Sequence, residues 1–193
     1  MGNSTRLTAL QQDSLWDFAL RFYALPGVEA ACLRLQDEGD VDVCELLFHC
    51  WLMIYGLKAK PQAFVAECRE RRRWQGEVTA VLRQLRQRLK GEAELAGAES
   101  GVAELRGVIK KAELMAEREN LQRWQQWGQS HENILEVTLS QQRSPQEVVS
   151  WLKMCVFSSR INHISCEGSS ISDEVENALS IIAYRLDPLI RAR

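Results

Sequence analysis

The sequence predicts an all-α protein, a multi-helix bundle with a long central antiparallel helical hairpin. Two observations predict this class. Apolar side chains recur every three or four residues through most of the chain, and helix-capping residues precede several of these runs. With 193 residues, of which 46% are hydrophobic, the chain is long enough to bury one substantial core. We therefore expect a single helical domain over residues 1–193.

Residues 14–57 are expected to form a compact core of helices. Ser14 can cap the first helix, and Gly39 can end the second. Asp42, followed three residues later by Glu45, resembles a capping box at the start of the third helix. This third helix is apolar nearly all round, which is typical of a helix at the centre of a protein.

Residues 61–128 are predicted to form the hairpin. A helical pattern runs from Pro61 to Lys90, and Gly76 is its weak point because glycine destabilises a helix interior. A segment rich in glycine and alanine follows, and a second helical pattern ends at Gly128. Both patterns carry an apolar stripe at spacings of three and four, so the two arms are expected to pack against each other. The stripe residues are Val78, Leu82, Leu85 and Leu89 on the first arm, and Leu105, Ile109, Ala112 and Ala116 on the second.

Residues 144–190 are expected to form two C-terminal amphipathic helices that pack across the hairpin. Ser144, Pro145 and Glu147 give an N-cap, a proline at the first helical position and a capping-box glutamate. The last helix is predicted to stop at Pro188, because proline cannot donate a backbone hydrogen bond.

The composition argues against several classes of function. A formal net charge of −2 gives no overall attraction to nucleic acid or anionic lipid. We find no export signal, and the most apolar stretch, residues 43–57, is shorter than the roughly 20 residues that a membrane span requires. The cysteines are expected to be reduced, mostly buried thiols, so we predict a cytoplasmic protein. They are Cys32, Cys44, Cys50, Cys68, Cys155 and Cys166.

Residues 15–52 resemble a family of proteobacterial proteins of about this length that has no established activity. The most specific part of the resemblance is the segment that reads Trp-Asp-Phe-Ala, then Tyr, then Pro-Gly-Val. The likeness extends to Trp74, to residues 82–90 and to residues 109–114, which is about two-thirds of the chain, and ends before about Ser130. It implies a bacterial cytoplasmic origin and a helical fold, and it assigns no catalytic or binding residue.

The most distinctive charge pattern lies in residues 58–90, which hold ten Lys or Arg and three Glu. Such a helix can neutralise phosphates, and a neighbouring tryptophan can stack on an unpaired base. The alternatives are a solvated face, or a face covered by the acidic residues of segment 29–45. The tryptophans in the hairpin are either buried under the facing arm or exposed as anchors for a binding partner, and we favour burial. The candidate surface is Arg69, Arg71, Arg72, Arg73, Trp74, Arg83, Arg86, Lys90, Trp124 and Trp127.

The function that these observations favour is a non-enzymatic interaction or adaptor protein whose partner is another protein. The first alternative is an RNA- or ribosome-associated protein that uses the basic helix at 58–90. The second is a hydrolase-like enzyme at the serine-rich loop of residues 158–170, where His163 lies close to Ser165 and Cys166. The chain has no Gly-x-Ser-x-Gly motif, no glycine-rich phosphate loop and too few histidines for a zinc site, so we predict no catalytic residue, metal or cofactor.

Overall fold

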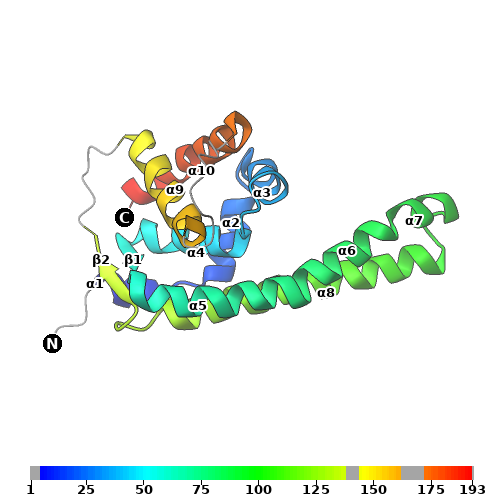
Figure 1. The fold of residues 1–193 in the computed structure, drawn as a ribbon, viewed down its shortest axis with the longest axis horizontal. Coiled ribbons are helices and arrows are strands. Elements are labelled where there is room, and N and C mark those ends of the chain that lie inside the picture. Colours follow the sequence, from blue (N-terminus) through cyan, green and yellow to red (C-terminus); the bar gives the residue numbers. More distant parts are fainter. Residues whose placement is uncertain (1–4, 138–143, 162–171, 193) are drawn as a thin grey trace.

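A computed structural model of the chain describes residues 5–137, 144–161 and 172–192, and for residues 158–161 it describes the backbone alone. The fold is all-α, as the sequence predicts, and Figure 1 shows a compact part from which two antiparallel helical arms project. We call the compact part the body. Its helices are α1 (Thr5–Gln11), α2 (Leu15–Tyr23), α3 (Val28–Asp37), α4 (Val43–Ile54), α9 (Pro145–Ile161) and α10 (Asp173–Arg191).

The two arms form the hairpin, which runs along one side of the body and continues beyond it (Figure 1). The predicted first arm is not one straight helix. It is interrupted by a π-helical turn that contains Gly76, the position identified as the weak point. The segments of the hairpin are α5 (Pro61–Trp74), the π-helix η1 (Gln75–Thr79), α6 (Ala80–Arg88), α7 (Lys90–Ala96) and α8 (Gly101–Gly128).

Helix α4 lies at the centre of the body, as its apolar sequence predicts. Every residue of α4 except Val43 is buried. Asp42 caps the helix by accepting hydrogen bonds from the backbone N–H groups of Cys44 (2.8 Å) and Glu45 (3.3 Å). Gly56 follows the helix with a φ of 65°, a conformation that glycine adopts without steric cost.

Three short elements escape prediction from the sequence. Helix α1 precedes Ser14, which caps α2 as expected by accepting a hydrogen bond from the N–H of Asp17. Strand β1 (Leu57–Ala59) pairs antiparallel with β2 (Ile134–Glu136). Three residues are too few for an alternating pattern to be recognised, so the strands carry no sequence signal of their own.

The C-terminal helices form, but one expectation about their position is wrong. They pack on α3 and α4 in the body rather than across the hairpin. The capping box of α9 is confirmed by reciprocal hydrogen bonds between Ser144 and Glu147. Helix α10 does not stop at Pro188 but continues to Arg191. Pro188 lies in the last turn of this helix and forfeits one hydrogen bond to the carbonyl four residues before it, and the packing of α10 on α3 and α9 holds the helix together past this point.

An aromatic cluster fastens the hairpin to the body. Trp124 of α8 is fully buried and stacks on Phe48 of α4 and Phe64 of α5, with ring centroids 4.6 Å and 5.4 Å away. Gly128 lies so close to Phe48 that a Cβ at this position would be 2.7 Å from the ring. The single hydrophobic core therefore includes the base of the hairpin but not its tip.

Candidate interaction surface on the hairpin

The clustered arginines of α5 form ion pairs with acidic side chains. Arg71 is largely buried and lies 2.9 Å from Glu67, and Arg73 lies 2.7 Å from Glu70. Arg72 reaches across to the body, where it lies 3.5 Å from a carboxylate of the acidic segment, that of Glu45. Arg69 remains exposed on α5. The positive charge of this helix is thus largely balanced within the chain.

Arg83 and Arg86 hold the two arms together. Both donate hydrogen bonds to Glu113, and Arg83 also donates to Glu117 over 2.7 Å. Burial alone would raise the pKa of Glu113, but the hydrogen bonds from Arg86 and Arg83 outweigh it and hold this pKa below its ordinary value. Lys90, nearer the tip, lies 3.9 Å from Glu94 in a solvent-exposed pair.

The three tryptophans of the candidate surface lie at different depths. Trp124 is fully buried, which removes it from any surface and confirms the preference for coverage at this position. Trp127 is half-buried against the same aromatic cluster. Trp74 donates from its indole N–H to the carbonyl of Ala116 over 3.0 Å, and the guanidinium of Arg123 lies 4.1 Å from its ring centre. Trp124 is therefore unavailable for stacking on a base, and Arg123 already occupies a position over the Trp74 ring.

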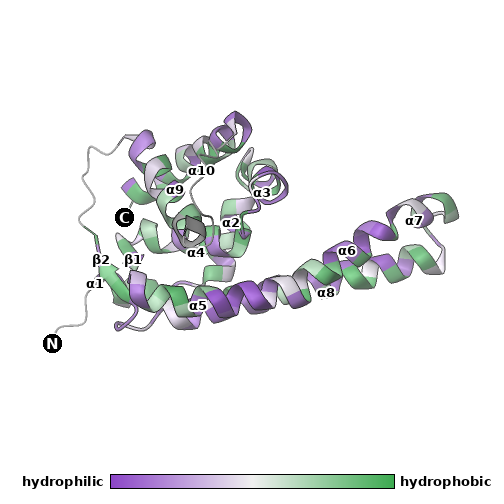
Figure 2. Ribbon diagram, in the orientation of Figure 1, coloured by the Kyte–Doolittle hydropathy of each residue, from purple (hydrophilic) through white to green (hydrophobic). Residues whose placement is uncertain are grey.

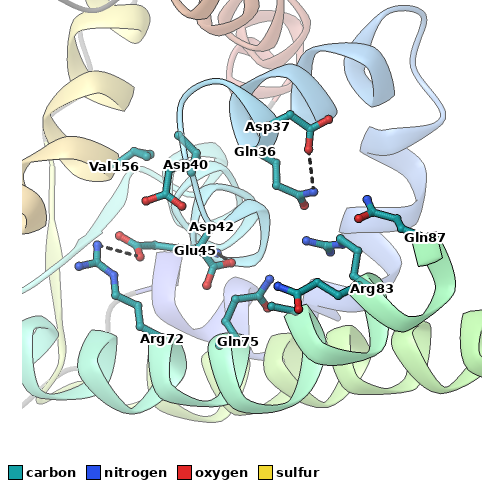
Figure 3. A pocket seen from close by; sticks show the side chains of 14 residues that line it. Gln36, Asp37, Asp40, Asp42, Glu45, Arg72, Gln75, Arg83, Gln87 and Val156 are labelled. Carbon is teal, nitrogen blue, oxygen red and sulfur yellow. Dashed lines mark hydrogen bonds and ion pairs between the residues drawn. The ribbon is translucent and has the colours of Figure 1, made fainter.

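A polar pocket of about 720 Å³ lies where the hairpin meets the body (Figure 3). Figure 3 shows the acidic side chains of the body facing Arg72 and Arg83 of the hairpin. Burial raises the pKa of Asp42, although its backbone hydrogen bonds oppose the shift. The charged groups of this pocket also serve the fold, because Asp42 caps α4, Glu45 pairs with Arg72, and Arg83 joins the arms. We interpret the pocket as the polar junction between body and hairpin.

Sequence reasoning missed an apolar face on the hairpin. Arg83 and Glu117 mark the side of the hairpin on which the arms are bridged by an ion pair. On α6, Val81 and Leu85 are each two residues from Arg83, and on α8, Met115 is two residues from Glu117. Successive residues of a helix are rotated by about 100°, so these three side chains point about 160° away from the side that carries the ion pair.

Val108 lies nine residues before Glu117, or about 180° around α8, and Leu105 is close to it on the same side. These five side chains, which are between 42% and 71% exposed, constitute what we call the outer face: Val81, Leu85, Leu105, Val108 and Met115. Figure 2 shows hydrophobic residues recurring along both arms out to the tip. The outer face could have been found as a second apolar stripe beside the predicted one, since Leu85 and Leu105 belong to both.

The buried thiols and the buried imidazole are not poised for chemistry. Burial raises the pKa of Cys32, Cys68 and Cys155 to about 12, which disfavours the reactive thiolate. Burial lowers the pKa of His49 to about 3. Among the described residues, no three His, Cys, Asp or Glu are grouped so that they could hold a metal ion. The catalytic alternative at residues 158–170 falls on His163, Ser165 and Cys166, which lie outside the described residues.

The model of a protein family described as "Protein of unknown function (DUF2390)" matches residues 14–124. The chain belongs to this family. The match covers the signature segment in residues 15–52 and continues through the first arm to the buried Trp124, so it includes α2, α3 and α4 of the body and most of the hairpin. No curated protein and no solved structure matches the chain.

The helices within residues 5–137, 144–161 and 172–192 do not combine the length and the apolar character that a membrane crossing needs.

Proposed function

We propose that this chain is a non-enzymatic, cytoplasmic bacterial interaction or adaptor protein, and that it binds another protein through the outer face of its hairpin. The observation that carries the proposal is the exposure of five large apolar side chains on one side of a projecting element. Contiguous apolar surface is costly in water, and on a folded protein it is typical of a binding site. The bacterial and cytoplasmic parts of the proposal rest on the family resemblance and on the five described cysteines, which are free thiols.

The ion pairs of the hairpin weigh against nucleic acid as the partner. Phosphate binding releases counterions only when the cationic side chains are available, but Arg71, Arg73 and Arg83 are already paired with carboxylates. A phosphate would therefore have to compete with a neighbouring Glu at each of these positions. The outer face, in contrast, presents its apolar side chains directly to solvent.

Site-specific photo-crosslinking in cells that express the protein would test the proposal. A photoreactive residue at Val108 lies on the outer face, and one at Leu114 lies on the other side of the same helix with nearly the same exposure, 52% against 55%. We expect a discrete adduct with another polypeptide from position 108 and none from position 114. The absence of an adduct at 108, or equal adducts at both positions, would refute the proposed binding surface.

A further inference from the structure

Resting on the proposed function, we infer that the occupant of the outer face is a second copy of this chain. Two hairpins would pack with their outer faces together and form a four-helix bundle. The symmetric pairing of two helical hairpins is a common way for such elements to complete a core.

The first argument is that the distal hairpin has no complete core of its own. None of the residues of α6 and α7 is buried, and the first buried residue of α8 is Glu113. Leu82 and Ile109, the central apolar residues between the arms, are only half-buried. Two helices side by side leave such side chains open on one flank, whereas four helices enclose them.

The second argument is the charge pattern of the outer face. Its five residues are uncharged, and so is Ala112, which lies between Val108 and Met115 on the same side of α8. The charged side chains that border the face have opposite signs: Arg88 is three residues after Leu85, and Glu104 is four residues before Val108. In a two-fold symmetric contact each patch meets an identical patch, so a charged residue near its centre would meet its own like charge. A face that selects a different protein commonly carries charges complementary to that partner. An outer face whose centre is uncharged and whose border carries charges of both signs fits self-pairing better.

The third argument is area. From Gly101 to Met115, α8 extends roughly 22 Å at about 1.5 Å per residue, and two helices packed about 10 Å apart are roughly 20 Å wide. The contact plane is then about 440 Å² on each copy, or about 900 Å² for two. This lies close to the roughly 1,000 Å² above which interfaces are specific, and below the size of a permanent dimer. The dimer is therefore reversible and its population depends on concentration.

Sedimentation velocity of the purified full-length chain over a wide concentration range tests this inference. We expect the wild-type chain to pass from monomer to dimer as its concentration rises. Val108→Glu would bury a charge in the contact and weaken dimerisation at least about tenfold. Leu114→Glu, which adds the same charge at an equally exposed position outside the outer face, would leave dimerisation as in the wild type. Circular dichroism of both variants would confirm that they remain folded.

A mixing experiment makes the test independent of any single variant. Val108→Glu and Val108→Lys would each be monomeric, and their mixture would recover a dimer because opposite charges then meet across the contact. A wild-type chain that stays monomeric at every concentration, or a Val108→Glu chain that dimerises like the wild type, would overturn the inference. Crosslinking of a different protein at position 108 would then leave the proposed function standing with another partner.

Discussion

Helices α4 and α6 differ in apolar content and end in opposite environments, since α4 is apolar nearly all round and α6 is apolar on one side only. In α4 every residue after Val43 is buried, because helices of the body cover it on several sides. In α6 no residue is buried, because the second arm covers one side and the remainder faces solvent. The apolar pattern sets how much of each helix can be covered, and the number of covering elements decides how much of it is covered. The apolar side chains of α4 therefore form a core in the body, whereas Val81 and Leu85 of α6 remain accessible on the hairpin.

The two regions also differ in what holds them together. The body is stabilised by a continuous hydrophobic core that ends at the aromatic cluster around Trp124. The distal hairpin depends more on the bridge that joins Arg83 and Arg86 to Glu113 and Glu117. We therefore expect substitutions in the body and at the base of the hairpin to change global stability, and substitutions near the tip to act locally.

The largest effect is expected at Trp124, where the core of the body extends into α8. Trp124→Ala would leave a cavity between Phe48 and Phe64 and lower the free energy of unfolding by about 3–5 kcal/mol. Leu105→Ala, on the exposed outer face of the same helix, would change it by less than about 0.5 kcal/mol. Urea denaturation at low protein concentration measures both values. Equal losses would contradict the division into a cored body and a coreless tip.

The next effect is a loss of folding stability in acid, which we expect from the buried His49 in the body. Its pKa is about 3 in the folded chain and about 6.5 when unfolded, so between these values the unfolded state binds a proton that the folded state does not. Stability is therefore lost as pH falls below about 6.5, at up to about 1.4 kcal/mol per pH unit.

Urea denaturation of the wild-type chain and of a His49 variant between about pH 6.5 and about pH 5 isolates this contribution, because Asp42 and Glu117, whose pKa values burial raises, are common to both chains. His49→Leu, which keeps an apolar side chain among Phe48, Phe64 and Trp151, should flatten the pH dependence. An identical slope in both chains would rule out His49 as its source.

A smaller, local effect is expected at the bridge between the arms. Glu113→Gln would weaken the hydrogen bonds from Arg83 and Arg86 by about 2–3 kcal/mol and increase amide hydrogen exchange in α6 and in the facing part of α8. Because the pKa of Glu113 is lowered, its contribution is present above about pH 4.3 and is lost as pH falls through the folded-state pKa.

Glu119→Gln is the matched control, because Glu119 forms a more exposed pair with Arg123 on the same helix. This control should cost no more than about 1 kcal/mol. Faster exchange throughout the body in Glu113→Gln would show that the bridge is not local to the hairpin.

The smallest pair of effects distinguishes the two ends of α8 through glycine. Gly128→Ala places a Cβ 2.7 Å from the Phe48 ring and should destabilise the chain by about 1–3 kcal/mol through overpacking. Gly107→Ala has nothing within 4 Å of its new Cβ and should stabilise α8 by about 0.5–1 kcal/mol, because alanine favours the helix. Thermal unfolding of the two variants should shift in opposite directions. Shifts of the same sign would show that packing does not differ between base and tip.

Local interactions explain what could be predicted of the fold. The caps at Ser14 and Asp42 and the capping box at Ser144 depend on neighbouring residues, and all three form as predicted. The two short strands could not be predicted, since β1 and β2 exist only because α4 and α8 bring them together. The helix that passes Pro188 shows the converse, because packing of α10 on α3 and α9 outweighs a local stop signal.

The candidate site depends even more on contacts distant in sequence. A run of arginines predicts a basic surface. Much of that charge is balanced by Glu45, which is 27 residues from its partner Arg72, and by Glu113, which is 30 residues from its partner Arg83. The burial of Trp124 and the exposure of Val108 also follow from where each position lies relative to the body. No local signal distinguishes them, because both occur on one amphipathic helix.

The sequence by itself therefore determined the helices, their caps and the pairing of the two arms, since these follow from spacing and from residues within a few turns of one another. Only the tertiary structure decided which apolar stripes are covered, which arginines are paired and which face of the hairpin remains open. The physical reason is that burial and charge pairing are relations between surfaces, and each surface is completed by residues from a different part of the chain.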